Sequence, residues 1–186
     1  MKLFVILVCF CASLSANGKN VTGYYWRDFD GSIPQDAYPG GRDINNRSIY
    51  IGQVLSNNLL IPAKIYYNKS KAFYEYAGKE YESEDNVKVL CTQQPENFKW
   101  IPTNNEDLKN LTDVFLVKGG FEPGCTTYIG RLRFEGEVLV GKALTGNPLN
   151  QGCYVTKKGH GHRHSSFEVL SFALSQSLLD VRFAAE

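Results

Sequence analysis

Two stretches of the chain, Ser-Ile-Tyr-Ile-Gly-Gln-Val-Leu at 48–55 and Thr-Tyr-Ile-Gly-Arg-Leu-Arg-Phe at 127–134, carry the same Tyr-Ile-Gly core 78 residues apart. In the second stretch Tyr, Gly, Leu and Phe alternate with other residues, which predicts a strand with one face toward a core and one toward solvent. A turn signal follows each stretch, Asn57-Asn58 in the first and Glu135-Gly136 in the second, and an apolar run follows each turn. The sequence therefore predicts two related β-hairpins, over 48–67 and 127–144.

Other landmarks recur in the same order around both hairpins, at offsets of 74 to 81 residues. They are Trp26 and Trp100, Gly40-Gly41 and Gly119-Gly120, Lys64 and Lys142, Gly78 and Gly159, and Val89-Leu90 and Val169-Leu170. We interpret the chain as two tandem repeats, 24–95 and 96–171, followed by a C-terminal tail at 172–186. The expected fold class is all-β, with two antiparallel sheets of four or five strands packed on each other with pseudo-twofold symmetry, because a small sheet cannot bury a face alone.

A second hairpin is expected in each repeat, around Gly78 in the first. Its strands are predicted from the apolar alternation at 74–76 and at 87–89, with the acidic stretch 80–85 as its solvated turn. No helix is predicted before residue 165.

The N-terminal residues 1–16 have the build of a signal peptide: one lysine, a short apolar run and then small residues. The alternative is a buried N-terminal strand. Four N-glycosylation sequons also favour export; they begin at Asn20, Asn46, Asn68 and Asn110. We therefore expect a secreted, extracellular protein with no membrane span. Cleavage would leave three cysteines, of which Cys125 and Cys153 are a candidate disulfide pair.

Composition excludes several classes of protein. The 20 Lys and Arg residues are balanced by 19 Asp and Glu, so there is no basic excess to bind nucleic acid. With 43% hydrophobic residues the chain is not a disordered protein. Aromatic residues make up 13% of the chain, which favours strands.

Taken together, the doubled landmarks resemble the DM-nine tandem-repeat family of invertebrate proteins. That pattern runs from Trp through Ile-Pro, Gly-Gly-x-Asp, a Tyr-x-Gly strand and a lysine turn to a closing Val-Leu. The first repeat matches it at Trp26, Ile33-Pro34, Gly40-Gly41, Asp43, Tyr50-Ile51-Gly52, Lys64 and Val89-Leu90. The second matches it at Trp100, Gly119-Gly120, Tyr128-Ile129-Gly130, Lys142, Tyr154 and Val169-Leu170.

Because the family includes a mannose-binding lectin used in pathogen recognition, the resemblance implies a lectin-like protein that binds mannose-type glycans on microbial or host cell surfaces. The sugar-binding residues it implies are Asp43 and Lys64 in the first repeat and Glu122 and Lys142 in the second. A carboxylate can accept hydrogen bonds from two sugar hydroxyls, and the glycine pairs would let backbone approach the ligand. The first repeat matches the pattern more closely, since Glu122 stands where the family has Asp, so the first site ranks above the second. A homodimer is a candidate way to raise avidity.

Several alternatives stay open. Asp43 and Lys64 could instead be a turn carboxylate and a lysine lying along a strand edge. The chain could also be a non-enzymatic protein-interaction module that has lost sugar binding, a reading favoured by Gln53, Glu122 and the Asn46 sequon in the loop of Asp43.

Motifs for other chemistry are weak. The stretch 136–143 imitates a phosphate-binding loop but lacks its Ser or Thr. His160, His162 and His164 alternate and could bind Zn²⁺ or Cu²⁺, although a variable surface loop explains them better. We expect no enzymatic activity, no cofactor and no metal site.

Overall fold

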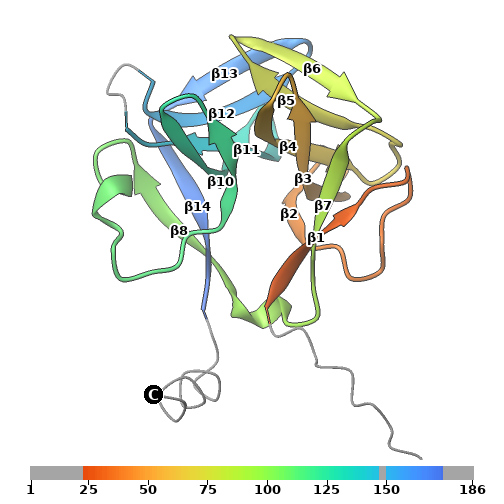
Figure 1. Cartoon of the computed structure of the whole chain (residues 1–186), viewed down its shortest axis with the longest axis horizontal. Helices are drawn as coiled ribbons and strands as arrows, with labels where there is room; N and C mark the ends of the chain where they lie inside the picture. Colours follow the sequence, from red (N-terminus) through yellow and green to blue (C-terminus); the bar gives the residue numbers. More distant parts are fainter. Residues whose placement is uncertain (1–22, 147–149, 174–186) are drawn as a thin grey trace, which may run out of the picture.

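The computed structural model describes residues 23–146 and 150–173, and within them each repeat contributes seven strands (Figure 1). The strands of the first repeat are β1 (Tyr24–Asp28), β2 (Pro39–Arg42), β3 (Ser48–Ser56), β4 (Leu59–Tyr66), β5 (Ala72–Tyr76), β6 (Lys79–Ser83) and β7 (Val87–Thr92). Those of the second are β8 (Phe98–Asn104), β9 (Lys118–Glu122), β10 (Cys125–Phe134), β11 (Glu137–Leu144), β12 (Gly152–Lys157), β13 (His160–His164) and β14 (Ser166–Phe172). Two 3-10 turns complete the described elements, η1 (Pro95–Asn97) and η2 (Leu108–Asn110).

Both repeats pair their strands in the same way. In the first, β3 pairs with β2, β4 and β7, β7 pairs with β1, and β4 continues into β5 and β6. In the second, β10 pairs with β9, β11 and β14, β14 pairs with β8, and β11 continues into β12 and β13. All of these pairings are antiparallel. The matching order confirms the predicted all-β fold with pseudo-twofold symmetry.

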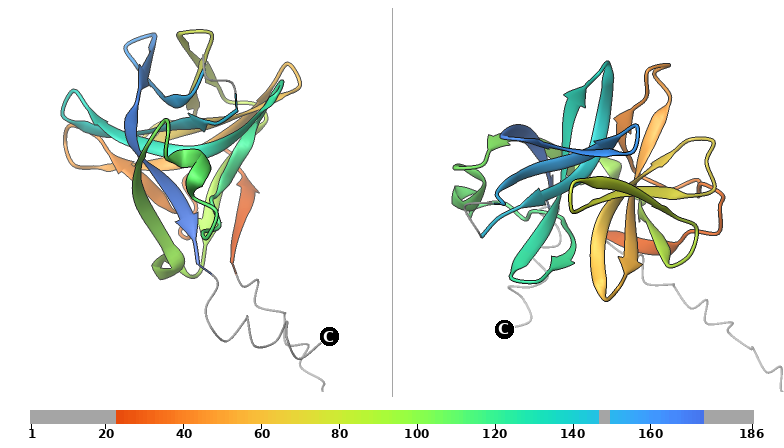
Figure 2. Two further views of the ribbon diagram at one scale, coloured as in Figure 1. Left: turned by 90° about the vertical axis from the view of Figure 1, so that its left-hand side faces the viewer. Right: turned by 90° about the horizontal axis from the view of Figure 1, so that it is seen from above.

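The repeats are joined by hydrogen-bonded strands, so the expected two separate sheets form one continuous network. Strand β2 pairs with β11, its counterpart β9 pairs with β4, and the two outer hairpins meet where β6 pairs with β13. The order β3-β2-β11-β10-β9-β4 therefore closes on itself through the β3–β4 pairing. Figure 2 shows the two halves interlocked around this ring, and the β5/β6 and β12/β13 hairpins lie side by side at the top of Figure 1.

The glycine pairs sit where the repeats cross. A Cβ on Gly41 would lie 2.1 Å from the carbonyl oxygen of Val138, and one on Gly120 would lie 1.9 Å from that of Leu60. Real side chains never approach backbone so closely, so only glycine fits there. These two glycines therefore let the strands of one repeat approach those of the other.

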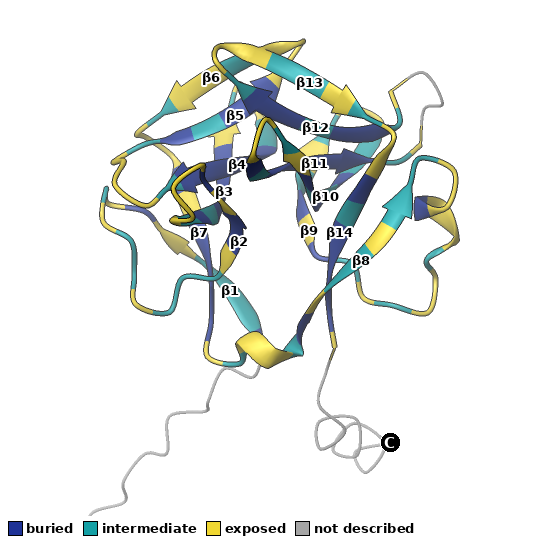
Figure 3. Cartoon of the chain, turned by 180° about the vertical axis from the view of Figure 1, so that it is seen from behind, coloured by how far each residue is buried: buried dark blue, intermediate teal, exposed yellow. Residues whose placement is uncertain are grey.

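Alternating apolar residues of both repeats fill the interior (Figure 3). One cluster contains Ile49, Ile51 and Leu90 together with Ile129, Leu139 and Val169, so both repeats contribute to it. A second cluster, around Val54, Ile65 and Val89, belongs to the first repeat. Each repeat thus completes part of its core with side chains of the other.

Some local expectations need correction. The hairpin around Gly78 joins β5 to β6, while Val87 and Val89 lie in the separate strand β7. The acidic stretch 80–85 is largely strand and holds a buried contact described below. The candidate disulfide is not formed, because Cys153 is buried in β12 against Gly130 while Cys125 begins β10 opposite Glu122, and both are free thiols.

Other expectations lie partly or wholly outside the described residues. The signal peptide 1–16, the Asn20 sequon and residues 174–186 of the tail do so. The other three sequon asparagines, Asn46, Asn68 and Asn110, are exposed. In the described part of the chain, no helix has the length and apolar character needed to cross a bilayer.

Candidate functional site

The lysine of the second repeat lies in a buried charged group at the junction of the two repeats. Lys142 is on β11, and its side chain is only 3% exposed. Its Nζ lies 2.5 Å from Oε1 of Glu122 on β9 and 2.8 Å from Oε2 of Glu75 on β5. The structure thus brings together Glu122 and Lys142, as the resemblance implies, and adds a carboxylate from the first repeat.

A cavity of about 270 Å³ opens above this group. Its lining includes Lys142, Glu75, Glu122 and the two tyrosines Tyr76 and Tyr154. The Lys142 ammonium is 5.5 Å from the ring centroid of Tyr154 and 5.9 Å from that of Tyr76. Most ligand sites combine aromatic walls with a few placed polar groups, and this cavity has that composition.

The chemistry of this cavity favours a neutral ligand rich in hydroxyl groups. Two carboxylates against one ammonium leave a net negative charge, which disfavours anions. Carboxylate oxygens accept hydrogen bonds from hydroxyls and the ammonium donates them, while a tyrosine face can pack on C–H groups. The lining therefore matches a sugar better than it matches a phosphate or an apolar molecule.

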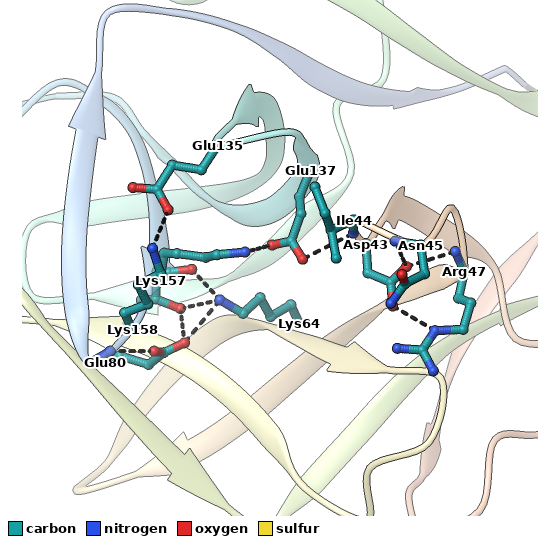
Figure 4. Close-up of polar contacts among 12 residues, drawn as sticks. Asp43, Ile44, Asn45, Arg47, Lys64, Glu80, Glu135, Glu137, Lys157 and Lys158 are labelled. Carbon is teal, nitrogen blue, oxygen red and sulfur yellow. Dashed lines mark hydrogen bonds and ion pairs between the residues drawn. The ribbon is translucent and has the colours of Figure 1, made fainter.

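The lysine of the first repeat has different surroundings (Figure 4). Lys64 is 1% exposed, and its Nζ donates to Oε1 of Glu80 at 2.9 Å and to both the hydroxyl and the carbonyl oxygen of Thr156. Glu80 also accepts from the Thr156 hydroxyl and from the N–H of Gly159, at 2.8 Å each. Burial opposes the ionisation of Glu80, but Lys64 and these donors hold its pKa below the usual value.

Asp43 lies in a turn and is held by its own loop. Its carboxylate accepts from the N–H of Asn45 at 2.9 Å and from the N–H and Nε of Arg47 at 2.8 Å each. Desolvation works against the charge, yet the contacts with Arg47 and Asn45 keep the pKa of Asp43 below its ordinary value. Figure 4 places Asp43 apart from Lys64, with Glu137 between them. The first-repeat pair thus has its own partners and is not joined by a contact that the structure records.

The strand register explains why the two sites differ. Lys64 and Lys142 occupy equivalent places, opposite Phe73 and Tyr154 respectively. Two residues further along, Thr156 of the second repeat corresponds to Glu75 of the first. At the following position, Lys157 corresponds to Tyr76 and forms an ion pair with Glu137. Both lysines are therefore paired with carboxylates of the protein, and Lys142 in addition lines a cavity that has two tyrosine walls.

Sequence reasoning missed the residues that one repeat lends to the other. Glu75 and Tyr76 of the first repeat line the Lys142 cavity, and Thr156 of the second repeat binds Lys64. The sequence pattern gives Tyr154 only a place among the repeated landmarks, and it predicts a solvated turn at Glu80, which instead contacts Lys64. Aligning the two repeats would have shown that Glu75 and Thr156 are equivalent positions. The alignment would not have shown that each of them lies beside the lysine of the other repeat.

The histidines lie on the outer strand β13. His160 pairs with Lys79 of β6, and the Phe134 ring packs on His162 and His164 at centroid distances of 4.5 and 5.3 Å. Burial, with a smaller effect of His162, lowers the pKa of His164. Among the residues that the structure describes, no group of three His, Cys, Asp or Glu side chains could hold a metal ion.

Comparison with known proteins agrees with this architecture. No curated protein matches the chain. The crystal structure of the nematode sperm cell motility protein MFP2B is similar to it, with a TM-score of 0.61, 16% sequence identity and coverage of 91% of this chain. The chain corresponds to 53% of the MFP2B chain, and the likeness at this identity concerns the fold alone. The family model of the DM9 repeat matches residues 43–147 and 122–183, overlapping ranges that together span more than half of the sequence. This chain therefore belongs to the DM9 repeat family.

Proposed function

We propose that the protein is a secreted, non-enzymatic lectin that binds mannose-type sugars in the Lys142 cavity. The observation that carries the proposal is the convergence of Lys142, Glu122 and Glu75 at the base of a cavity with tyrosine walls. Sequence features favour export, namely the signal-peptide-like N-terminus and the sequons, three of which lie at exposed asparagines.

In the proposed complex, Glu122 and Glu75 accept hydrogen bonds from neighbouring sugar hydroxyls. The Lys142 ammonium donates to a hydroxyl or ring oxygen, and the ring of Tyr154 packs on the C–H face of the sugar. Sugar binding must compete with the short ion pair between Lys142 and Glu122, and loss of that contact offsets part of the free energy gained from the sugar. The affinity of a single site is therefore expected to be low. A homodimer, or repeated sugars on a microbial or host surface, would raise the overall avidity.

Both repeats are required for this site. Glu122 and Lys142 come from the second repeat, whereas Glu75 and Tyr76 come from the β5/β6 hairpin of the first. The Lys64 group plays a complementary part, since Lys64 and Glu80 of the first repeat hold Thr156 and Gly159 of the second. In this proposal the first site ties the repeats together, and the second binds the ligand.

The test is retention on mannose-agarose, followed by a glycan array. Glu122→Gln keeps the shape of the side chain but removes its charge, and it is expected to abolish retention. Glu135→Gln is the matched control, because Glu135 is also paired with a lysine but lies on the surface, 46% exposed, and it should bind like the unmodified protein. Circular dichroism verifies that both variants fold.

Retention that survives Glu122→Gln would overturn the choice of site. A second candidate function, a non-enzymatic protein-interaction module, is favoured by the engagement of Asp43 and Lys64 within the protein itself. Absence of binding to every sugar on the array would favour this second function.

A further inference from the structure

A second cavity, of about 320 Å³, lies in the first repeat between the β3/β4 hairpin and the β5/β6 hairpin. It is lined by Ser56, Asn57, Leu59, Ile61, Tyr74, Tyr76 and Tyr81. No charged side chain is among these lining residues. The rings of Tyr74 and Tyr81 are stacked with their centroids 5.7 Å apart, and the Tyr74 hydroxyl donates to Oγ of Ser56 at 3.2 Å. We refer to it as the tyrosine cavity.

The tyrosine cavity exists because the two repeats differ at a few equivalent positions. By strand register, Ser56 corresponds to Phe134 and Tyr81 to His162, and in the second repeat the Phe134 ring packs directly on His162, 4.5 Å between centroids. Leu59 and Tyr76 correspond to Glu137 and Lys157, which form an ion pair. A small Ser56 in place of a phenylalanine leaves open the space that Phe134 fills in the other repeat.

Tyr76 belongs to the lining of both cavities, so the tyrosine cavity adjoins the Lys142 cavity at this side chain. Tyr76 and Tyr81 are 42% and 41% exposed, and both therefore present ring surface to solvent. The two adjoining cavities differ in chemistry. One is charged and polar and the other is aromatic and neutral.

From this arrangement we propose that the tyrosine cavity is a second subsite, which binds the next sugar residue of a glycan whose terminal residue occupies the Lys142 cavity. The ligand class is thus an oligosaccharide rather than a single sugar. This inference rests on the proposed function of the Lys142 cavity. The faces of Tyr76 and Tyr81 supply stacking surface for the C–H face of a sugar ring, while Ser56 and Asn57 supply hydrogen-bonding groups at its edge.

The test compares two probes, methyl α-mannoside and an α-linked mannotriose, by isothermal titration calorimetry on the full mature chain. If the second sugar residue gains one contact with a tyrosine ring, the mannotriose should bind about tenfold more tightly than methyl α-mannoside. Two variants remove the subsite by different means. Tyr81→Ala removes an exposed stacking face, and Ser56→Phe fills the cavity in the way that Phe134 fills its counterpart. Tyr67→Ala is the matched control, since Tyr67 is an exposed tyrosine, 59% accessible, outside both linings.

In both subsite variants we expect the preference for mannotriose to disappear while the affinity for methyl α-mannoside stays within about twofold of the unmodified protein. Tyr67→Ala should keep the preference. Equal affinity of the unmodified protein for the two probes, or a preference that survives Tyr81→Ala and Ser56→Phe, would overturn the subsite but leave the monosaccharide site intact. Failure to bind either sugar would instead overturn the proposed function and the subsite with it. Binding of an apolar peptide that Tyr81→Ala abolishes, without any preference among sugars, would assign the tyrosine cavity to a protein partner.

Discussion

Gly120 gives the most direct test of how the two repeats are joined. Its φ lies in the ordinary range, so alanine at this position carries no backbone strain of its own. The added Cβ would nevertheless lie 1.9 Å from the carbonyl oxygen of Leu60 and 2.6 Å from its carbonyl carbon. Because these are backbone atoms within a hydrogen-bonded strand, β9 must move away from β4, where Phe121 pairs with Leu60.

Overpacking of this kind typically costs about 1–3 kcal/mol, and contact with backbone places Gly120→Ala near the upper end, about 3 kcal/mol. For a chain of this size, this loss corresponds to a decrease in Tm of roughly 6–12 °C. Glu122 lies two residues along the same strand, so the displacement should also weaken sugar retention.

Differential scanning calorimetry measures the effect, and Gly52→Ala is the matched control. Its Cβ would lie 3.1 Å from the flexible end of Ile65, a contact that a small shift relieves, so its Tm should change by only a few degrees. A Tm of Gly120→Ala equal to that of Gly52→Ala or of the unmodified protein would refute the inference that close backbone approach joins the two repeats.

Two further predictions concern titration and thiol reactivity. The lowered pKa values of Glu80 and Asp43 mean that their contribution to stability is complete above the unfolded carboxyl pKa, near 4, and is lost as the pH falls through their folded values. The urea concentration at the midpoint of unfolding should therefore decrease as the pH is lowered below about 4. Arg47→Ala removes a partner of Asp43 and should make this decrease shallower. If the midpoints of the variant and the unmodified protein decreased in parallel, the Asp43–Arg47 contact would not be a source of the pH dependence. Burial, assisted by Asp36, raises the pKa of the Cys91 thiol to about 12, and burial likewise raises that of Cys153. Under native conditions at pH 8, iodoacetamide should modify Cys125 and spare Cys91 and Cys153, as read by peptide mass spectrometry, whereas equal modification of all three would show that the strands open readily.

The hairpins were predictable because their signal is local. The alternation at 127–134, the turn residues Glu135-Gly136 and the repeated Tyr-Ile-Gly core depend only on neighbouring residues and on the two-residue period of a strand. The β5/β6 hairpin was assigned the wrong return strand for the opposite reason. Val87 and Val89 carry a clear strand pattern, but their pairing with β1 and β3 depends on tertiary contacts.

The site was predictable only in part. The resemblance implies a site made of Glu122 and Lys142, and the structure places their charged groups 2.5 Å apart. The same resemblance ranks Asp43 and Lys64 above this pair, because it compares positions and not surroundings. What distinguishes the two sites is the residue that each receives from the other repeat, Glu75 in one and Thr156 in the other.

The amino-acid sequence by itself determined the all-β class, the division of the chain into two copies of one unit of short strands, and the chemical types at the two lysine positions, since these follow from local alternation and internal repetition. The tertiary structure alone decided that Lys142 lines a cavity, which residues of the other repeat contact each lysine, and which strands the glycine pairs bring together. The physical reason is that every one of these features arises where strands of one repeat cross those of the other, between residues as far apart in the sequence as Gly41 and Val138.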